Sequence, residues 1–402
     1  MKTRIVTARG ILPRADSFVG KSGRAGLLIQ GGLVAGLLEG THAIERARDA
    51  HGATVEDLGD AVLVPAFVNA HAHLELSGLA GLVEPGDSFP AWVGQVLKHR
   101  FARSPEQLAE DARGGLARLA QTGTALVGDI DSSGATMKAL AKAHAQSGPA
   151  PAVVLHREVI DAWDPGRTAA AMESLAQPIP PESGAVEGYS PHAPYTVSRD
   201  LLALVAEQRR NRPGPVAVHW AEMEEELTWL ESGTGPLAAM LGESPGCSGL
   251  DLLLEAGLLG HTTALIHGNL PSRGEPERIA RTGATIVHCP GTHRYFDRGD
   301  FPLDRYLAAG VPIALGTDSL ASNEDLDLLR EARLLWARHP GIAPAQLFEM
   351  ATSAGARVLG YAGRAGCLEV GAMAKWLCVE RGPQGGSQVD LGAIFETLFV
   401  EG

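Results

Sequence analysis

The sequence predicts an α/β protein built on a (β/α)8 TIM barrel with a small β-module attached. From Ala61 onward, apolar runs of strand length alternate with longer helical patterns, which is typical of parallel strands joined by crossover helices. Eight such runs occur, and eight strands close a barrel. The chain has 402 residues, enough for a barrel and one appended module.

The first 60 or so residues contain short strand-like pieces broken by glycines, RIVTARGILP and GLLIQGGLVAGLLE, which indicate the small β-module. The barrel strands are predicted in AVLVPAFVNAHAH from Ala61, TALVGDID from Thr124, PAVVLHREVI from Pro151, AVEGYSPHAP from Ala185, PVAVHWAE from Pro215, TALIHGNL from Thr263, ATIVHCPG from Ala284 and VPIALGTDS from Val311.

Helical patterns fill the gaps between these runs. In SPEQLAEDARGGLARLAQTG, Ser104 can cap the helix, Pro105 opens its first turn and Gly123 lies just past its end. After the eighth run, EDLDLLREARLLWARH and PAQLFEMATSAGARVLGYA predict two further helices. GCLEVGAMAKWLCVE from Gly366 predicts a strand that can pair with the N-terminal module, and RGPQGGSQ near Arg381 predicts a loop.

Composition excludes several classes of protein. Hydrophobic residues make up 45% and charged residues 20% of the chain, which is ordinary for a folded globular protein. The formal charge of −13 disfavours nucleic acid and anionic lipid as partners. The four cysteines form no C-x-x-C pair, so a reducing, cytoplasmic location is expected. No segment resembles a signal peptide or approaches about 18 uninterrupted apolar residues, so a membrane span is not expected.

Histidines and one aspartate stand at the C-terminal ends of the predicted barrel strands. His71 and His73 close the first run, His219 the fifth, His267 the sixth and Asp318 the eighth. These strand ends meet on one face of a barrel, where active sites of this fold lie. Two-residue alternation directs both histidines of the H-x-H pair to the same side. Three of these imidazoles together with the carboxylate make a ligand set that suits zinc or another first-row divalent ion.

Each of these residues also has a structural interpretation. An H-x-H pair can lie on any polar loop, and His267 alone can be a core residue. Asp318 can cap a following helix. His288, which also follows a strand, is either packed or directed at the substrate.

The motifs VPAFVNAHAHLE, HWAE, IHGN, HCPGTH and LGTDSLASN, in this order, resemble those of the amidohydrolase superfamily. NAHAHLELS, SPHAPYT, HCPGTHRYF and GTDSLASN are similar to the nucleoside deaminase branch that contains S-adenosylhomocysteine deaminase, and most similar to the aminodeoxyfutalosine deaminases of menaquinone biosynthesis. The resemblance implies a barrel at residues 61–365 flanked by a β-sandwich made of residues 1–60 and 366–402.

The resemblance also implies one divalent ion, Zn²⁺ or alternatively Fe²⁺, held by His71, His73, His219 and Asp318. A single ion is expected because the fourth strand end, SPHAPY, has no lysine to form a bridging carbamate. A carboxylate at the third strand end, Glu158, makes a second ion disfavoured rather than excluded.

Catalytic roles follow from the same resemblance. Glu222, three residues after His219, matches the H-x-x-E glutamate that acts as general acid and base. His267 would orient the water, and Asp318 would be both ligand and base. The alternative for Glu222 is a solvated helix face, which is expected for the acid run Glu224–Glu226.

Substrate contacts are predicted at His192, Ser319 and Glu75. His192 would reach the purine or the ribose, whereas Glu75 would bind a hydroxyl or orient a metal-binding histidine. A benzoate carboxylate on the substrate needs a cation, for which Arg157 and Arg294 are candidates because both lie just beyond strand ends. Surface arginines more often pair with nearby acids.

The function expected is deamination of an adenine nucleoside, namely 6-aminodeoxyfutalosine to futalosine with release of ammonia. The alternatives are deamination of S-adenosylhomocysteine, methylthioadenosine, adenosine or guanine, hydrolysis of a cyclic amide or a chlorinated triazine, and a non-catalytic scaffold. The cytidine deaminase fold is excluded because it needs a P-C-x-x-C pair. A homo-oligomer is also expected.

Overall fold

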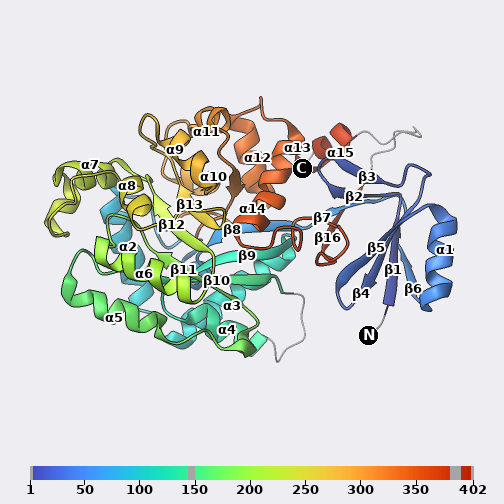
Figure 1. Ribbon diagram of the computed structural model, residues 1–402, viewed down its shortest axis with the longest axis horizontal. Coiled ribbons are helices and arrows are strands. Elements are labelled where there is room, and N and C mark those ends of the chain that lie inside the picture. Colours follow the sequence, from blue (N-terminus) through green and yellow to red (C-terminus); the bar gives the residue numbers. More distant parts are fainter. Residues whose placement is uncertain (1–2, 144–149, 381–390, 400–402) are drawn as a thin grey trace.

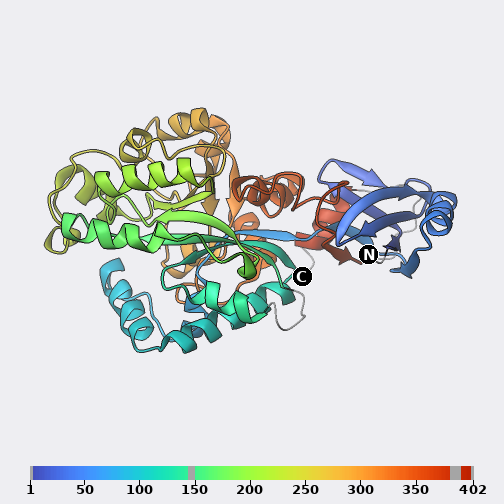
Figure 2. The same cartoon turned by 60° about the horizontal axis from the view of Figure 1, so that its bottom comes forward.

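The protein forms two lobes, a barrel and a smaller β-domain, in the computed structural model (Figure 1, Figure 2), which describes residues 3–143, 150–380 and 391–399. The larger lobe holds one eight-stranded sheet, and the smaller lobe holds two four-stranded sheets. The predicted loop near Arg381 lies outside the described residues.

All eight predicted barrel strands are present, and they pair in chain order as one parallel sheet. The sheet closes because Ala72, at the end of the first barrel strand, bridges in parallel to Asp318, just after the last. The predicted (β/α)8 barrel is confirmed. Its strands are β8 (Phe67–Ala72), β9 (Thr124–Asp131), β10 (Ala152–Val159), β11 (Val186–Pro191), β12 (Val216–Trp220), β13 (Thr263–His267), β14 (Thr285–His288) and β15 (Ile313–Leu315).

The first predicted run contains two strands rather than one. Its beginning forms β7 (Val62–Pro65), which pairs antiparallel with β16 (Trp376–Val379) in the small domain. The Ala66 N–H donates to the carbonyl of Lys375 at 3.1 Å, and the next residue, Phe67, opens β8. The Phe67 N–H already donates to the Gly123 carbonyl at 3.0 Å, so the chain passes from one sheet to the other at this point.

Helices surround the barrel as the alternation predicts (Figure 1). The α3 helix starts with the expected cap, because Ser104 Oγ accepts from Gln107 N at 3.2 Å and Gln107 Oε1 accepts from Ser104 N at 2.8 Å. The helices of this lobe before the last strand are η1 (Leu74–Leu79), α2 (Phe89–Phe101), α3 (Pro105–Gln121), α4 (Ala135–Ala143), α5 (Pro165–Ala176), η2 (Pro181–Ser183), α6 (Arg199–Asn211), α7 (Glu224–Ser232), η3 (Pro236–Ala239), α8 (Gly249–Glu255), α9 (Glu275–Thr282), α10 (Pro290–Tyr295) and α11 (Leu303–Ala309).

Three helices, not the predicted two, lie between β15 and β16: α12 (Leu328–Arg338), α13 (Pro344–Met350) and α14 (Ser353–Val358). The predicted second helix is divided at residues 351–352 because the barrel uses its backbone there. The carbonyl of Ala351 accepts from Val68 N of β8 at 2.9 Å, and a Cβ added to Gly355 would lie 2.9 Å from the Val68 carbonyl oxygen. The α14 helix thus packs closely against the barrel interior.

The small domain consists of two sheets that enclose an apolar core, as expected for a β-sandwich. The predicted return strand is present as β16, which pairs with β7 rather than with a strand of residues 1–60; β7 in turn pairs with Gly10–Arg14 of that module. Two helices were not predicted. The α1 helix (Gly40–His51) lies in this domain, buries only Ile44 and so has little apolar pattern, whereas α15 (Leu391–Phe399) packs on α13 of the barrel lobe through Phe395 and Phe348. The other strands are β1 (Thr3–Ala8), β2 (Gly10–Arg14), β3 (Ser17–Val19), β4 (Ala25–Gln30), β5 (Leu33–Glu39) and β6 (Thr54–Asp57).

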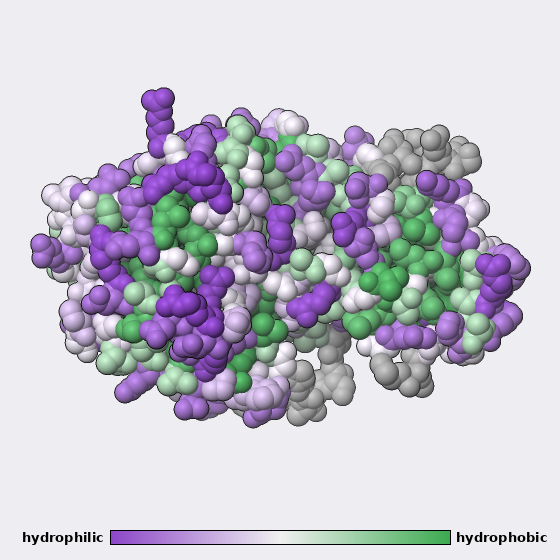
Figure 3. All heavy atoms as spheres, viewed as in Figure 1, coloured by the Kyte–Doolittle hydropathy of each residue, from purple (hydrophilic) through white to green (hydrophobic). Residues whose placement is uncertain are grey.

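The surface is polar over much of the barrel, and hydrophobic residues gather over the small domain on the face shown in Figure 3. Leu33 and Val55 of the small domain are 47% and 45% exposed. Within the described residues, no helix combines the length and apolar character needed to cross a bilayer.

Candidate active site

The structure brings the four predicted metal ligands together at the C-terminal ends of the barrel strands. His73 Nε2 lies 3.3 Å from His219 Nε2, and Asp318 Oδ1 lies 3.4 Å from His71 Nε2 and 3.6 Å from His73 Nε2. His267 joins this cluster, because one of its ring nitrogens lies within 4.8 Å of ligand atoms of His71 and Asp318.

The backbone at these strand ends adopts an unusual conformation. Ala221, His267 and Asp318 have φ values of 49°, 71° and 56°, in the left-handed region that non-glycine residues rarely adopt. Such strain persists only where the surrounding structure enforces it, and it is concentrated at functional sites. Here the Asp318 N–H donates to the His71 carbonyl at 3.1 Å, which fixes the aspartate beside the histidine.

The donor set fits a divalent metal ion. Both ring nitrogens of His71 are buried without a hydrogen-bond partner in the described part of the chain, a costly arrangement unless another group binds one of them. His219 Nδ1 donates to the carbonyl of His192 at 3.1 Å, which leaves Nε2 as the electron-pair donor facing His73. Imidazole nitrogens and one carboxylate are ligands that zinc accepts.

The charges of the cluster suit metal binding as well. Burial lowers the pKa of His73 to about 4, and it lowers the pKa values of His219 and His267 well below their usual range. Burial alone would raise the pKa of Asp318, but the contact with His71 and the nearby His267 and His73 outweigh it and lower that pKa well below its usual value. Neutral imidazoles and an ionised carboxylate are the forms that bind metals.

Glu222 lies beside the cluster, with Oε2 3.6 Å from His267 Nε2. Burial raises the pKa of Glu222 to about 8, with Asp318 and Glu226 adding to the shift and Arg298 opposing it. A carboxyl group with such a pKa can hold a proton at neutral pH and give it away, as a general acid and base must.

The expectation that Glu226 is a solvated helix residue is wrong. Its side chain is buried, and its carboxylate accepts from Ala221 N at 3.1 Å and from Glu222 N at 2.9 Å. Glu226 is the third residue of α7, from which a glutamate can reach back to backbone N–H groups before the helix. It therefore holds the turn that carries Glu222, whereas Glu224 is exposed as expected.

His192 lies at the cluster, with its ring centroid 4.8 Å from that of His219. Its Nδ1 is hydrogen-bonded to Thr196 Oγ1 at 2.7 Å, so Nε2 remains for other contacts. A carboxylate oxygen of Glu158 and a ring nitrogen of His192 lie within 4.8 Å of each other and of His219. Glu158 therefore lines the same region, where it is hydrogen-bonded to Ser132.

The two predicted cation candidates are not brought to the cluster. Arg157 Nη1 pairs with Glu187 Oε1 at 2.9 Å, and Arg294 Nη2 pairs with Glu324 Oε1 at 2.5 Å. Both arginines pair with nearby acids, the alternative considered for them.

Three other singled-out residues are engaged in protein contacts. Glu75 Oε1 accepts from Arg100 Nε at 2.8 Å. Its other carboxylate oxygen accepts from Ser133 Oγ. Ser319 is buried, and its Oγ accepts from Ala321 N at 3.2 Å. His288 is packed, with its ring stacked on Phe301 at 3.7 Å between centroids.

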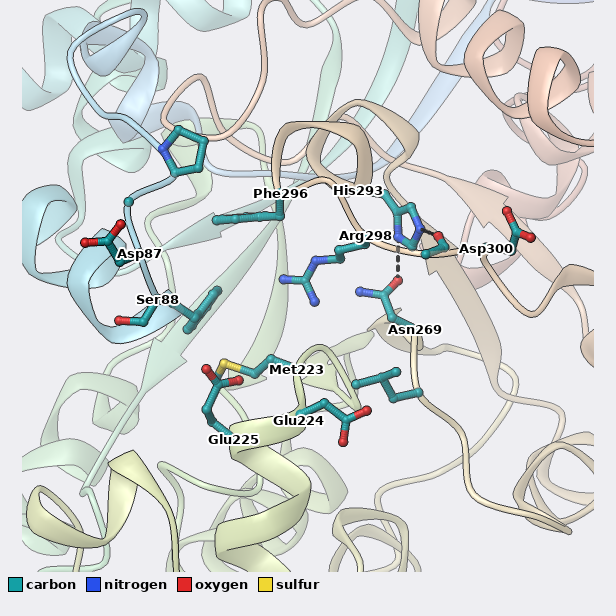
Figure 4. A pocket seen from close by; sticks show the side chains of 15 residues that line it. Asp87, Ser88, Met223, Glu224, Glu225, Asn269, His293, Phe296, Arg298 and Asp300 are labelled. Carbon is teal, nitrogen blue, oxygen red and sulfur yellow. Dashed lines mark hydrogen bonds between the residues drawn. The ribbon is translucent and has the colours of Figure 1, made fainter.

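A cavity of about 390 Å³ (Figure 4) is lined by Met223 and Arg298, the chain neighbour and the ion-pair partner of Glu222, but not by Glu222 itself or by any of the four predicted metal ligands. Phe89, Phe296 and Met223 supply apolar walls, and the Arg298 guanidinium points toward the centre. Arg298 was not predicted from the sequence. Its one distinguishing feature there is its position four residues after Arg294 in HCPGTHRYFDR. Four further lining residues are acidic: Asp87, Glu224, Glu225 and Asp300.

Comparison with known proteins places the chain in a family. An aminodeoxyfutalosine deaminase of Deinococcus radiodurans is 31% identical over 326 residues, which cover 76% of this chain and 75% of that protein. A 5-methylthioadenosine/S-adenosylhomocysteine deaminase of Pyrococcus abyssi is 30% identical over 355 residues, covering 84% of this chain and 79% of that protein.

Solved structures share the fold. The aminofutalosine deaminase of Helicobacter pylori in complex with methylthio-coformycin has a TM-score of 0.81 at 20% identity and covers 99% of this chain and 96% of that one. An adenosine deaminase of Xanthomonas campestris with bound zinc has a TM-score of 0.76 at 23% identity, with 98% and 88% covered. The family described as the amidohydrolase family matches residues 62–396. The chain therefore belongs to the amidohydrolase family, whose members are metal-dependent hydrolases and deaminases, and it is an enzyme of that family.

Proposed function

We propose that the protein removes the 6-amino group of an adenine nucleoside by hydrolysis. The observation that carries this proposal is the position of Glu222, a buried carboxyl group beside a cluster of three histidines and one aspartate. Deamination of a purine needs a water and a proton donor at one carbon atom, and this arrangement provides a place for both.

His71, His73, His219 and Asp318 would hold one divalent ion, for which we propose zinc. When bound, such an ion supplies Lewis acidity and lowers the pKa of water from about 15.7 toward roughly 7. Asp318 accepts a proton from the attacking water, and His267 orients that water.

Glu222 carries out the proton transfers to the substrate. It protonates the ring nitrogen next to the amine-bearing carbon, which makes that carbon more electrophilic as the water adds. The deprotonated Glu222 then takes the proton of the added hydroxyl group, which becomes the carbonyl oxygen, while the proton held by Asp318 passes to the departing amine. The tetrahedral carbon collapses, the C–N bond breaks and ammonia leaves with the bonding electron pair. His192 is proposed as a contact to the purine or ribose. Every residue assigned here lies within residues 61–365, the proposed barrel domain.

For the substrate we propose 6-aminodeoxyfutalosine, with futalosine as the product. The proposal is supported by the Deinococcus relative and by the cavity, whose aromatic walls can accommodate an aromatic substituent of the nucleoside. A second candidate is methylthioadenosine or S-adenosylhomocysteine. It is supported by the Pyrococcus relative and by the acidic residues of the cavity, which favour an ammonium group over a carboxylate.

The test is a substrate panel with the zinc-loaded protein, comprising aminodeoxyfutalosine, methylthioadenosine, S-adenosylhomocysteine, adenosine and guanine. Ammonia release and the absorbance change from adenine to hypoxanthine measure turnover. The highest kcat/KM is expected for aminodeoxyfutalosine. A higher value for S-adenosylhomocysteine would favour the second candidate, and inertness toward all the adenine nucleosides with metal in place would refute the proposed activity.

A further inference from the structure

We infer that Arg298 is a positioning residue that holds the Glu222 carboxylate in the orientation needed for proton transfer, an inference that rests on the proposed function. The guanidinium contacts Glu222 twice. Its Nη2 donates to Glu222 Oε1 at 3.0 Å, and its Nη1 donates to the backbone carbonyl of the same residue.

Two contacts to one residue restrict the side chain more than a single ion pair would. The backbone contact fixes the guanidinium relative to the Glu222 main chain, and the side-chain contact then fixes one carboxylate oxygen relative to the guanidinium. The other oxygen, Oε2, remains 3.6 Å from His267 Nε2, on the side of the metal-ligand cluster. The side chains of Glu222 and Arg298 are only 8% and 15% exposed, so solvent and salt screen their interaction weakly.

Arg298 is itself held in place by neighbouring groups. Its guanidinium lies over the Phe296 ring at 4.9 Å. The next residue, Gly299, accepts through its carbonyl from His293 Nε2 at 2.5 Å, and His293 Nδ1 is hydrogen-bonded to Asn269 Oδ1 at 3.1 Å. Figure 4 shows these side chains converging at one side of the cavity.

Asn269 completes the network, because its Nδ2 donates to the Glu222 carbonyl at 3.1 Å. That carbonyl thus accepts from groups on two separate loops, the one after β13 and the one after α10. The Glu222 main chain is therefore held by donors from two loops, which restricts the orientation of its side chain as proton transfer requires.

A different role for Arg298 is direct binding of a substrate carboxylate, since it lines the cavity. The two roles predict different kinetics. A positioning residue acts on the chemical step and therefore mainly on kcat, whereas a binding residue acts mainly on KM.

The experiment compares Arg298→Ala, Arg298→Lys and the unchanged protein on the nucleoside that the unchanged protein turns over best. We expect kcat to fall by roughly 10- to 100-fold in Arg298→Ala, the loss associated with one hydrogen bond to a charged group, with KM changed by less than about threefold. Arg298→Lys keeps the charge but not the fork of donors, so a smaller loss of kcat is expected. Added guanidinium ion should restore part of the kcat of Arg298→Ala and none of the activity of Glu222→Gln.

Two further measurements separate positioning from general damage. Metal content per chain should be unchanged in Arg298→Ala. In the metal-free protein, the losses of unfolding free energy in Glu222→Gln and Arg298→Ala, measured by urea denaturation, should not sum to the loss in the double variant, because the two side chains interact. Arg278→Ala is the matched control: it breaks an ion pair with Asp251 at 2.6 Å and should leave kcat and KM unchanged.

An unchanged kcat with a raised KM in Arg298→Ala would overturn the inference in favour of substrate binding. A double variant whose loss of unfolding free energy equals the sum of the two single losses would also overturn it. If Arg298→Ala fails to fold, Arg298→Lys decides, because full kcat in that variant contradicts the need for a forked donor. If the unchanged protein turns over no nucleoside, the proposed function fails, whereas additivity in the metal-free protein counts against Arg298 alone.

Discussion

Glu331 should make the folded protein less stable as the pH rises from 5 to 8. The side chain is fully buried, and its carboxylate accepts from Gly291 N at 2.6 Å and from Asn323 Nδ2 at 2.7 Å. It thereby ties the start of α10 to the loop that carries Asp318. Burial raises the pKa of Glu331 from 4.5 to about 8, although both hydrogen bonds act in the opposite direction.

The sign of the effect follows from proton binding. Between pH 4.5 and 8 the folded chain keeps the Glu331 proton that the unfolded chain releases, so raising the pH favours unfolding. Each unit of pKa difference corresponds to about 1.4 kcal/mol, so stability should fall by about 2 kcal/mol between about pH 5 and pH 7 through this group.

Glu331→Gln removes the titration and keeps the shape of the side chain. The amide loses one hydrogen bond, because it cannot accept from both Gly291 and Asn323, but this cost does not change with pH. The advantage of the unchanged protein over Glu331→Gln should therefore shrink by about 2 kcal/mol from about pH 5 to pH 7, as measured by urea denaturation. Glu349→Gln, at an exposed position of α13, is the control for loss of a carboxylate. Parallel stability curves for the unchanged protein and Glu331→Gln would refute the reasoning.

Three further predictions concern the site and the core. Glu222→Gln should retain the metal ion and lose turnover, whereas His219→Ala should lose both, as measured by metal content and ammonia release; near-normal turnover in the glutamine variant would contradict the proton-transfer role. Removal of metal by a chelator should lower stability, by about 3 kcal/mol relative to protein in free metal at about 100 times its Kd, and equal melting curves would argue against a bound ion. Gly123→Ala should destabilise the barrel by about 1 to 3 kcal/mol, because Gly123 has a φ of 82° and the added Cβ would lie 2.4 Å from Leu377 Cδ2; an unchanged melting temperature would contradict this.

The sequence was sufficient to predict the barrel and the residues that meet at its mouth. Strands such as Thr124–Asp131 are buried along their whole length, so they appear in the sequence as clear apolar runs. Once eight such runs are recognised, the chain topology brings their C-terminal ends together. His71 and Asp318 are 247 positions apart in the sequence, yet the order of strands alone makes them neighbours.

Side-chain direction within a strand was partly predictable. His156 and Glu158 alternate with Arg157 along β10, so the arginine must face the other side of the sheet. Gly128 and Gly188 on the flanking strands leave room for the fully buried His156 ring. Alternation thus indicates that Glu158, rather than Arg157, faces the barrel interior.

Arg298 was beyond such reasoning because it lies in a loop. The preceding residue, Asp297, has a φ of 49°, and this left-handed residue changes the chain direction just before the arginine. No periodicity governs a side chain placed by a single unusual dihedral angle. Glu226 was missed for a different reason. A run of acidic residues at the start of a helix is typical of a solvated surface. Only the place of Glu226 as the third residue of the helix indicated that its carboxylate can accept from backbone N–H groups before the helix.

Closure of the barrel and formation of the metal-ligand cluster depend on the same contacts. The last strand, β15, has three residues, and the seam between it and β8 is made mainly beyond its end. There the His71 carbonyl accepts from Thr317 N at 3.0 Å and from Asp318 N at 3.1 Å, while Asn69 Nδ2 donates to Thr317 Oγ1 at 2.7 Å. An ion bound by both His71 and Asp318 would join the first and last strands across this seam. Loss of the ion should therefore weaken the closure of the barrel as well as the chemistry, which is the physical reason to expect metal removal to be visible in a melting curve.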